Sequence, residues 1–474
     1  MSTFSGLSTA LSSLIAQRQA LDVAGQNVAN ANTAGYTRQR ADLTSVNALS
    51  VPSMFSAQSG AGNGTRVTGI TRMGDEFLDA RLRATTSSAS TQRARATSLS
   101  RLESTITEPS ETSVSAQLQT FWAGWHDVAN QPSDPAARQV LLGDAGALVS
   151  QIAGGYRAVE SQWAQMRTET QTLATEVNTT AQGIAQLNDN IRSIQVSGGS
   201  ANELVDQRSV LVTKMSALVG ASARERQDGT IDVMVGGNAL VRGVRANAVE
   251  VTGSFTMSGA ISGTAPVGLS WAATGTPLGL DGGTLASHLA DLSPGGSLAG
   301  ALTAWNDVAT SLADKVNAVH ATGYSQETPP VTGRAFFAYD ATGTTPAALS
   351  LTVALQGHPE QVAAASAGKG PVDGSLADRI GRLVSEAGGP DQVWRSFVVD
   401  LGVRTQAAAQ RATVLESARS TAENLQLSSS SVDLDEESVN MLAYQRAYEG
   451  AARVLTTMDE MLDVLINRTG VVGR

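Results

Sequence analysis

The sequence contains no cysteine, few aromatic residues and very few lysines. The absence of cysteine excludes disulfides and thiolate metal sites, and it suits a protein that ends up outside the reducing cytosol without covalent cross-links. Aromatic residues make up 4% of the 474 residues, whereas alanine, serine, threonine and glycine are abundant. This composition favours helices that approach each other closely through small side chains over a large aromatic interior.

Positive charge is scarce and scattered. Lysine occurs only at Lys214, Lys315 and Lys369, and the formal net charge is −10 with a pI of about 5.0. Without a local basic patch, these values argue against a nucleic-acid partner. No stretch reaches ~18 uninterrupted apolar residues, so no membrane insertion is expected. The first basic residue is Arg18, and the lack of a charged segment before an apolar run argues against a cleavable secretory signal.

Residues that could carry catalysis or hold a metal ion are sparse. The four histidines stand far apart, without the spacing of metal ligands: His126, His288, His320 and His358. His126 follows Trp125 on an expected helix and is interpreted as a residue of a helical bundle. HExxH, Walker A and GxSxG motifs are absent. We therefore predict no enzyme, no catalytic, cofactor-binding or metal-binding residue, and no cofactor.

The last fifty or so residues carry two interleaved apolar series at heptad spacing. The first series consists of Leu434, Met441, Tyr448, Leu455 and Leu462. The second, offset by three, consists of Tyr444, Ala451, Met458 and Leu465, and Glu437 breaks it at its start. Together they predict one seam along a helix over 435–466 that must pack against another helix.

Four carboxylates stand at the start of this expected helix: Asp433, Asp435, Glu436 and Glu437. Asp433 is expected to cap the helix with Glu436 as its reciprocal partner, because both carboxylates favour the positive end of the helix dipole. A calcium site is the less favoured alternative, because the cluster lacks the glycine turn and alternating ligands of an EF-hand loop.

The first thirty residues carry a second apolar seam, with a spacing of three and four: Phe4, Leu7, Leu11, Leu14, Leu21 and Val28. Asn30, Asn32 and Gly35 then supply residues that end helices. The economical interpretation is that the two seams meet and bring the termini together in one helical domain. The alternative is that each seam packs on its own neighbouring globule.

Between the two seams, helical and extended patterns alternate. Helical periodicity over 75–219 resembles an elongated bundle, with a helix expected to begin near Ser113 and another after the Asp134-Pro135 pair. Helix is expected again from 285 to 319 and from 393 to 427.

Extended segments are expected in three places. The stretch YTRQRADL after Gly35 looks extended, whereas the serine- and glycine-rich residues 45–75 are expected to contain a loop. Alternating Ile231, Val233 and Val235 predict a strand that turns at 236–238 and returns from Leu240. Short strands are expected at 336–337 and 349–355.

The length suggests about three domains. We predict a mainly α, elongated multidomain chain in which the N- and C-terminal helices pair in a coiled-coil-like core domain. The predicted domains are a terminal assembly domain (1–55 plus 430–474), an elongated helical bundle (56–219 plus 285–323 plus 390–429) and an inserted β-rich or mixed outer domain (220–284 plus 324–389).

The two ends together resemble the terminal signatures of the flagellar axial proteins, the family of rod, hook and hook-associated subunits. The matching stretches are SGLSTALSSLIAQRQALDVAGQNVANANTAGYTRQR and VDLDEESVNMLAYQRAYEGAARVLTTMDEMLDVLIN. Interior segments such as TFWAGWHDVANQPSDPAARQVLL, ELVDQRSVLVTKMSALVG and DGTIDVMVGGNALVRG are similar to the hook-associated members. The resemblance covers most of the chain and is weakest over 245–280 and 340–390. One outer domain is expected, because the insertion is short for members with two.

This resemblance implies a structural subunit that polymerises at the distal end of the hook and adapts it to the filament. Implied partners are other copies of the chain, the hook protein, a second hook-associated junction protein, an export chaperone and the flagellar type III export apparatus. The implied location is the hook–filament junction outside the cell, reached without signal cleavage. The residues of both seams, together with Tyr36, are then the expected assembly interface, which orders upon assembly.

Two rival functions stay open. One is a neighbouring axial role as a hook or distal-rod subunit, against which the DPAAR and DQR segments argue. The other is a secreted enzyme or adhesin carried on an axial scaffold. That function would require a pocket with acid–base groups in residues 220–284, which supply mainly glycine, alanine, valine and threonine.

Overall fold

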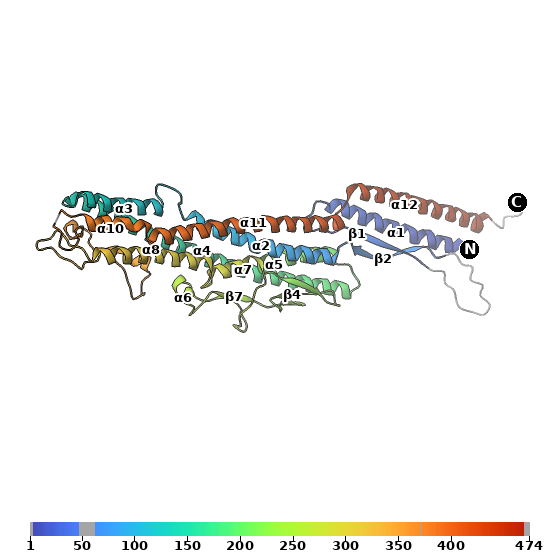
Figure 1. The fold of residues 1–474 in the computed structure, drawn as a ribbon. Coiled ribbons are helices and arrows are strands. Elements are labelled where there is room, and N and C mark those ends of the chain that lie inside the picture. Colours follow the sequence, from blue (N-terminus) through green and yellow to red (C-terminus); the bar gives the residue numbers. More distant parts are fainter. Residues whose placement is uncertain (1–2, 47–61, 371, 469–474) are drawn as a thin grey trace.

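The computed structural model describes residues 3–46, 62–370 and 372–468. The molecule is elongated, with α1 (Thr3–Asn30) and α12 (Leu434–Asp463) at one pole and α3 (Val114–Asn130) and α10 (Ser375–Gly381) at the other (Figure 1). Helices dominate and the sheets are small, so the predicted mainly α, elongated fold is confirmed.

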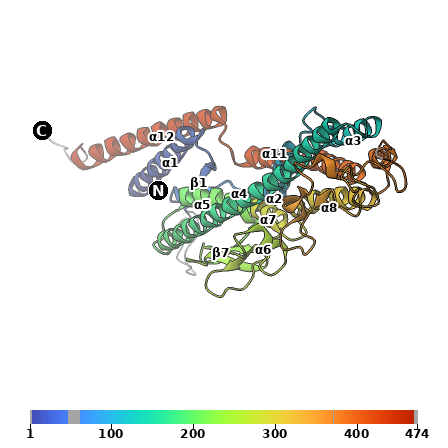
Figure 2. The ribbon, with the colours of Figure 1, turned by 90° about the vertical axis from the view of Figure 1, so that its left-hand side faces the viewer.

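The terminal helices lie side by side at the first pole (Figures 1 and 2). Helix α1 (Thr3–Asn30) packs along α12 (Leu434–Asp463), which continues as the π-helical turn η3 (Val464–Arg468). The antiparallel hairpin of β1 (Gln39–Ser45) and β2 (Thr65–Arg72) also packs on α1. The prediction that the N- and C-terminal helices pair is confirmed. We call α1, β1, β2 and α12 the terminal unit.

Strand β2 differs from the expectation of a loop within 45–75. Its side chains include the β-branched residues Val67 and Ile70, which pack with Ala41 of β1 and Ala20 of α1. This burial and the pairing with β1 outweigh the weak strand preference of Gly69. The extended stretch after Gly35 became β1 as predicted.

A bundle of long helices forms the middle of the molecule. It contains α2 (Glu76–Ser104), α3 (Val114–Asn130), α4 (Pro135–Val196), α5 (Asn202–Val219) and α11 (Pro390–Ser430). The side chains of Asp75, Ser113 and Asp134 accept hydrogen bonds from the first turns of α2, α3 and α4, so the predicted helix starts at Ser113 and Asp134 are confirmed. The 62 residues of α4 span about 93 Å at 1.5 Å per residue.

Two shorter helices complete the bundle, α7 (Gly283–Leu292) and α8 (Ser297–His320). The sequence pattern predicted one helix from 285 to 319, but Pro294 and the two glycines after it interrupt it. Large aromatic side chains fill the core here, and close approach depends on glycine. A Cβ at Gly155 of α4 would lie 2.1 Å from the ring of Trp305 on α8.

The β-rich insertion after α5 covers one side of the bundle (Figure 1). Its four-stranded antiparallel sheet follows chain order: β3 (Ser222–Glu225), β4 (Ile231–Val235), β5 (Asn238–Arg242) and β6 (Arg245–Ala246). A second pair, β7 (Val249–Thr252) and β8 (Gly268–Trp271), flanks the short helix α6 (Met257–Ile261). The predicted alternation holds, because Ile231, Val233 and Val235 are all buried against α4 and α5.

Residues 324–389 form the pole opposite the termini (Figure 1). Their elements are β9 (Phe337–Ala338), α9 (Ala347–Ser350), β10 (Thr352–Val353), η1 (Pro359–Gln361), α10 (Ser375–Gly381) and η2 (Arg382–Ser385). Helix α9 occupies the start of the strand expected at 349–355.

The predicted grouping of 220–284 with 324–389 stays a prediction. Phe336 and Phe337 pack on Phe121 and Trp125 of α3, and the same buried cluster contains Met257, Ala260 and Val267 of the insertion. The other predicted domain limits stay predictions, and the limit between 55 and 56 lies outside the described residues.

A buried histidine fastens this pole to the end of α8. The Nδ1 of His320 lies 2.8 Å from the carbonyl oxygen of Arg334, and its Nε2 accepts the backbone N–H of Ala363 at 2.9 Å. Burial lowers the pKa of His320 from 6.5 to about 4. A protonated ring would turn an N–H donor toward the N–H of Ala363, so only the neutral ring fits.

We predict that this pole loses stability as the pH falls from about 6.5 to about 4. The unfolded chain binds the proton near pH 6.5, whereas the folded chain binds it only near pH 4. The stabilisation is therefore complete above pH 6.5 and is lost as the pH falls to about 4, which lowers the free energy of unfolding by about 3 kcal/mol. The measurement is urea unfolding followed by tryptophan fluorescence at pH 7 and pH 4.5. His320→Gln should flatten the difference relative to the parent chain, whereas His358→Gln, at an exposed site, should preserve it. Equal pH dependence in the parent and His320→Gln would contradict the prediction.

Candidate assembly site at the paired terminal helices

Helix α12 packs on α1 in an antiparallel register with large residues against small ones. Tyr444 packs on Ala20 and Val23, and a Cβ at Gly6 would lie 2.6 Å from the Cε of Met458. Tyr444 and Met458 are fourteen residues apart on α12, as are Gly6 and Ala20 on α1. Fourteen residues are two heptads, as expected for a heptad seam. We call this side of α12 its inward face.

The predicted seam residues divide between half-buried and exposed positions. Those that are half-buried are Leu7, Leu14, Leu21, Tyr36, Met441, Tyr444, Ala451, Leu455, Met458 and Leu462. Those that are exposed are Leu11, Val28, Leu434, Tyr448 and Leu465. Phe4 lies in α1, but its side chain is outside the described residues. Their role as an assembly interface stays a prediction.

The most buried apolar residues of α1 are small ones that the leucine pattern passed over: Ala10, Ala16, Ala20 and Ala24. Between them lies Val23, packed with Ala41 of β1. The helix thus buries an alanine stripe, because alanine lets neighbouring backbones approach closely. The leucines of the predicted seam flank this stripe and remain partly available to another partner.

A second apolar row on α12 points away from this packing. It consists of Val439, Leu442, Val454 and Met461, with 68%, 49%, 48% and 54% of their surface exposed. We call it the outward row. On α1, Leu11 and Ile15 are likewise 51% and 57% exposed. Exposed apolar side chains that gather on neighbouring helices are typical of surfaces that bind protein.

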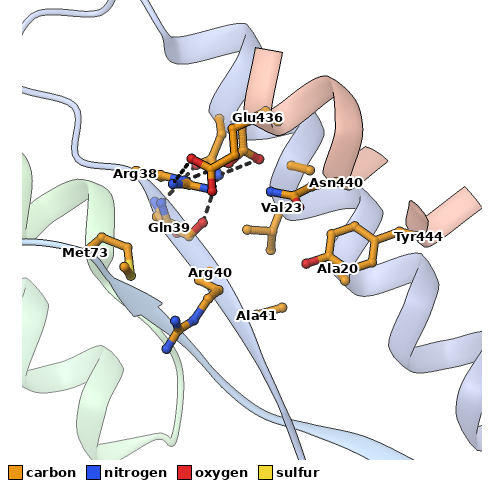
Figure 3. Close-up of a pocket in the computed structure, with 13 residues that line it drawn as sticks. Ala20, Val23, Arg38, Gln39, Arg40, Ala41, Met73, Glu436, Asn440 and Tyr444 are labelled. Atoms are coloured by element: carbon orange, nitrogen blue, oxygen red, sulfur yellow. Dashed lines mark hydrogen bonds and ion pairs between the residues drawn. The ribbon is translucent and has the colours of Figure 1, made fainter. Parts of the chain in front are cut away.

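Polar contacts fix the start of α12. Asp433 caps the helix by accepting the N–H groups of Asp435 and Glu436 at 2.9 and 3.2 Å. The Glu436 carboxylate accepts Nη1 of Arg38 at 2.9 Å (Figure 3). Burial by itself would lower the pKa of Arg38, but hydrogen bonds and charge from Glu436 and Glu437 raise it above its usual value.

Glu437, which breaks the heptad series, is the one residue of α12 that is fully buried. It accepts Nε of Arg38 at 2.7 Å and Nδ2 of Asn27 at 3.2 Å. The Asn27 oxygen in turn accepts the Tyr36 hydroxyl at 2.9 Å and the Gln39 N–H at 3.0 Å. The sequence pattern identified Glu437 only as an interruption of the heptad series. Its position in the seam was the signal that could have predicted a buried partner for the carboxylate.

A set of polar contacts, which we call the joint, connects the terminal unit to the first turns of α5. Asp206 is buried and accepts the Thr37 N–H at 2.9 Å and Nε of Arg72 at 2.5 Å. Gln39 donates to Glu203 at 3.1 Å and accepts from Asn202 at 3.0 Å. Within the described residues, none of the three hydrophobic clusters contains side chains from both the terminal unit and the bundle.

Gly35 and Tyr36 lie next to the joint, and their surroundings explain why a glycine and a tyrosine stand at these two positions. Gly35 has φ +79°, and a Cβ there would lie 2.4 Å from Val210 of α5, so glycine is required for both reasons. Burial, together with the charges of Glu203, Asp206 and Glu437, raises the pKa of Tyr36 to about 12. Tyr36 is therefore a neutral hydrogen-bond donor at any physiological pH.

A cavity of about 240 Å³ lies between α1, β1 and the start of α12 (Figure 3). Its lining combines apolar side chains such as Ala20, Val23 and Tyr444 with polar ones such as Arg40 and Asn440. The described residues hold no group of three or more histidine, aspartate or glutamate side chains that could bind a metal ion.

No helix among the described residues is long and apolar enough to cross a membrane.

We predict that Asp206→Ala loosens the terminal unit from the bundle. The substitution leaves the Thr37 N–H and the Arg72 guanidinium without their acceptor, and breaking such a buried pair costs about 3–5 kcal/mol. Hydrogen exchange of the amides over 37–45 is the measurement, and it should become faster in the variant. Asp189→Ala, which removes an exposed carboxylate paired with Arg192 on α4, is the control and should not change it. Unchanged exchange in Asp206→Ala would count against the joint.

Three family models match the chain. The helical domain of the flagellar hook-associated protein FlgK matches residues 99–337, just over half of the chain. The C-terminal domain of the flagellar basal body rod proteins FlgEFG matches 426–468, and the flagella basal body rod protein matches 7–37. The two end matches fall on the terminal helices, whereas the central match covers α3, α4, α5, the β-rich insertion, α7 and α8.

Relatives and a solved structure agree with the central match. Flagellar hook-associated protein 1 of Bacillus subtilis is 28% identical over an alignment that spans the whole of both chains. The protein of the same name from Escherichia coli is 32% identical over 51% of this chain and 43% of its own length. The structure of the flagellar hook junction protein FlgK from Burkholderia pseudomallei shares the fold, with a TM-score of 0.62 and 16% identity over 74% of this chain and all of that one. The chain belongs to the FlgK family of flagellar hook-associated proteins.

Proposed function

We propose that the chain is a structural subunit of the hook–filament junction, which polymerises at the distal end of the hook and adapts it to the filament. One observation carries the proposal: both terminal helices expose apolar residues on the same slender pole. Leu11 and Ile15 on α1, and Leu442 and Val454 on α12, are each about half exposed or more. Neighbouring subunits that cover these residues would gain hydrophobic burial worth ~25 cal/mol per Å².

The two apolar sides of α12 take different roles in this proposal. The inward face, with Tyr444 and Met458, pairs with α1 of the same subunit. The outward row is the surface offered to other subunits, together with the exposed part of the predicted seam. The domain predicted at 1–55 plus 430–474 is then the assembly domain, and the bundle and insertion project from it. A repeated contact between unlike surfaces extends as an open helix when its rotation does not close a ring, and a helical layer requires a contact of this kind.

The partners follow from this role. We propose that the subunit contacts other copies of itself, the hook protein and a second hook-associated junction protein. Delivery to the hook tip would use an export chaperone and the flagellar type III export apparatus, without signal cleavage. A structural role is favoured over an enzymatic one because the polar groups at the terminal pole hydrogen-bond to each other and position helices.

A hook or distal-rod subunit is the second candidate. The matches at 7–37 and 426–468 support it equally well, because they carry the names of basal body rod proteins. The match over 99–337 favours the junction, since it lies in the helical domain of a hook-associated protein. A test of location therefore decides between the two.

A truncated chain that lacks residues 434–474 tests whether α12 is needed for assembly. Without α12 the bundle keeps its own cores and should stay folded and soluble, but the chain should no longer be incorporated at the hook tip. The measurement is labelling of isolated hooks in cells that carry only this chain or its truncation. The full chain should appear as a band at the distal end alone. Label along the whole hook, or normal incorporation of the truncated chain at the hook tip, would contradict the proposal.

Substitutions on the two sides of α12 should differ in their effects on assembly and on monomer stability. Leu442→Asp lies in the outward row and should block incorporation while changing monomer stability by no more than about 0.5 kcal/mol, as for most surface substitutions. Leu455→Asp faces α1 and should lower the free energy of unfolding by ~1–3 kcal/mol, because a charge enters a half-buried seam. Thermal unfolding of the monomers and the hook-tip label measure both effects. Equal loss of monomer stability in the two variants would show that α12 has no free side.

A further inference from the structure

A pocket of about 420 Å³ opens on the surface of the β-rich insertion. Its lining comes from β5, from the residues that precede β7 and from the turn that follows β8. The insertion covers the side of the bundle opposite α11 (Figure 1). Because no residue of the terminal unit lines the pocket, its shape does not depend on whether α1 and α12 are ordered.

The lining of this pocket combines one aromatic ring with uncharged polar groups. The half-buried indole of Trp271 lies among the amides of Asn238 and Asn247 and the hydroxyls of Thr274 and Thr276. Such amides and hydroxyls both donate and accept hydrogen bonds. The lining contains no carboxylate and no imidazole, so it offers neither metal ligands nor a general acid or base. Its chemistry is that of binding a molecule that has both hydroxyl groups and C–H faces.

The backbone around the pocket is already paired, so recognition must come from side chains. The N–H of Trp271 donates to the carbonyl oxygen of Thr276, and the N–H of Ala272 donates to that of Ala248, both at 2.9 Å. Strand β8 lies beside β7, and β5 lies between β4 and β6. A peptide that binds by adding a strand needs an open strand edge, which the pocket does not offer.

An unpaired pair of arginines stands at the edge of the pocket. Arg242, which lines it, is the cross-strand partner of Arg245 in the antiparallel register of β5 and β6. Directly opposite side chains lie on one face of a sheet with their Cβ atoms about 5 Å apart, and like charges in this arrangement are destabilising. Both arginines are exposed, and among the described residues neither guanidinium is paired with a carboxylate.

A carboxylate bound at this edge would remove the repulsion between the two arginines. Acidic residues outnumber basic ones in the chain by 43 to 33, so the missing partner does not reflect a shortage of carboxylates. Arginine binds a carboxylate through two parallel hydrogen bonds, which gives the contact both strength and direction. A nucleic acid fits less well, because it would meet a chain with a net charge of −10.

We propose that this pocket binds an acidic saccharide. The sugar ring lies against the indole of Trp271 and hydrogen-bonds to the surrounding amides and hydroxyls, and its carboxylate pairs with Arg242 beside Arg245. This binding activity goes beyond the proposed structural role. It belongs to the insertion, so it is measured on the free full-length chain without reference to hooks.

The test uses two sugars that differ only in the carboxylate, methyl glucuronide and methyl glucoside. Each is titrated into the full-length chain, and binding is followed by saturation-transfer NMR. The glucuronide should bind at least roughly tenfold more tightly, because only it makes the charge-assisted pair with Arg242. Methyl galacturonide and methyl galactoside form a second matched pair with the other ring stereochemistry. Sodium acetate, a carboxylate without a ring, should compete only weakly.

Three variants separate the contributions of charge and ring. Arg242→Gln should reduce the affinity for the glucuronide to that for the glucoside and leave the latter unchanged. Trp271→Phe keeps an apolar ring in the fold but should weaken binding of both sugars by roughly threefold or more. Arg224→Gln makes the same change at an exposed arginine of β3 outside the pocket, and should alter neither affinity. Thermal unfolding shows whether each variant keeps the stability of the parent chain.

Four results would overturn the proposal. They are equal affinities of the parent chain for the acidic and neutral sugars, an equal loss in Arg224→Gln and Arg242→Gln, competition by acetate as strong as by the glucuronide, and no saturable signal from either acidic sugar. The third would show an anion-binding patch that does not recognise the ring. Arg242→Gln should still be incorporated at the hook tip, so the failure of this proposal and that of the junction role are distinguishable.

Discussion

Everything at the terminal pole depends on how the carboxylate of Glu437 is satisfied. The side chain is removed from water, so its charge must be balanced by the guanidinium of Arg38 and the amide of Asn27. Asn27 also accepts the Tyr36 hydroxyl and the Gln39 N–H, which binds the end of α1 to the start of β1. One buried charge therefore connects the two ends of the chain across 410 residues of sequence.

The terminal unit and the bundle are stabilised by different forces. The bundle buries tryptophans and phenylalanines in a continuous core, whereas the terminal unit buries alanines and one small cluster around Ala20, Val23 and Ala41. The joint between them is made of hydrogen bonds and ion pairs centred on Asp206. A polar interface of this kind is typical of domains that can move relative to each other. The thin apolar core also explains why α12 depends on a polar anchor for its placement.

Periodicity was sufficient to predict the helices and the meeting of the two ends, because heptad and capping signals are local. The caps at Ser113 and Asp134 and the strand at 231–235 belong to the same class. Long-range pairing was not accessible. Strand β2 and the position of Phe336 and Phe337 against α3 depend on partners far away in sequence. At the candidate site, the sequence identified the seam but not Asn27, Arg38 or Asp206, since nothing local distinguishes a buried polar residue from a solvated one.

The outward row raises the question of how a monomer tolerates exposed valine, leucine and methionine. The side chains lie on a helix that also carries Arg446, Glu449, Arg453 and Glu460 on its exposed surface, and the whole chain has a net charge of −10. Such charges oppose non-specific association but not a contact that pairs them with opposite charges on a neighbour. An apolar row framed by charge therefore favours an ordered partner over aggregation.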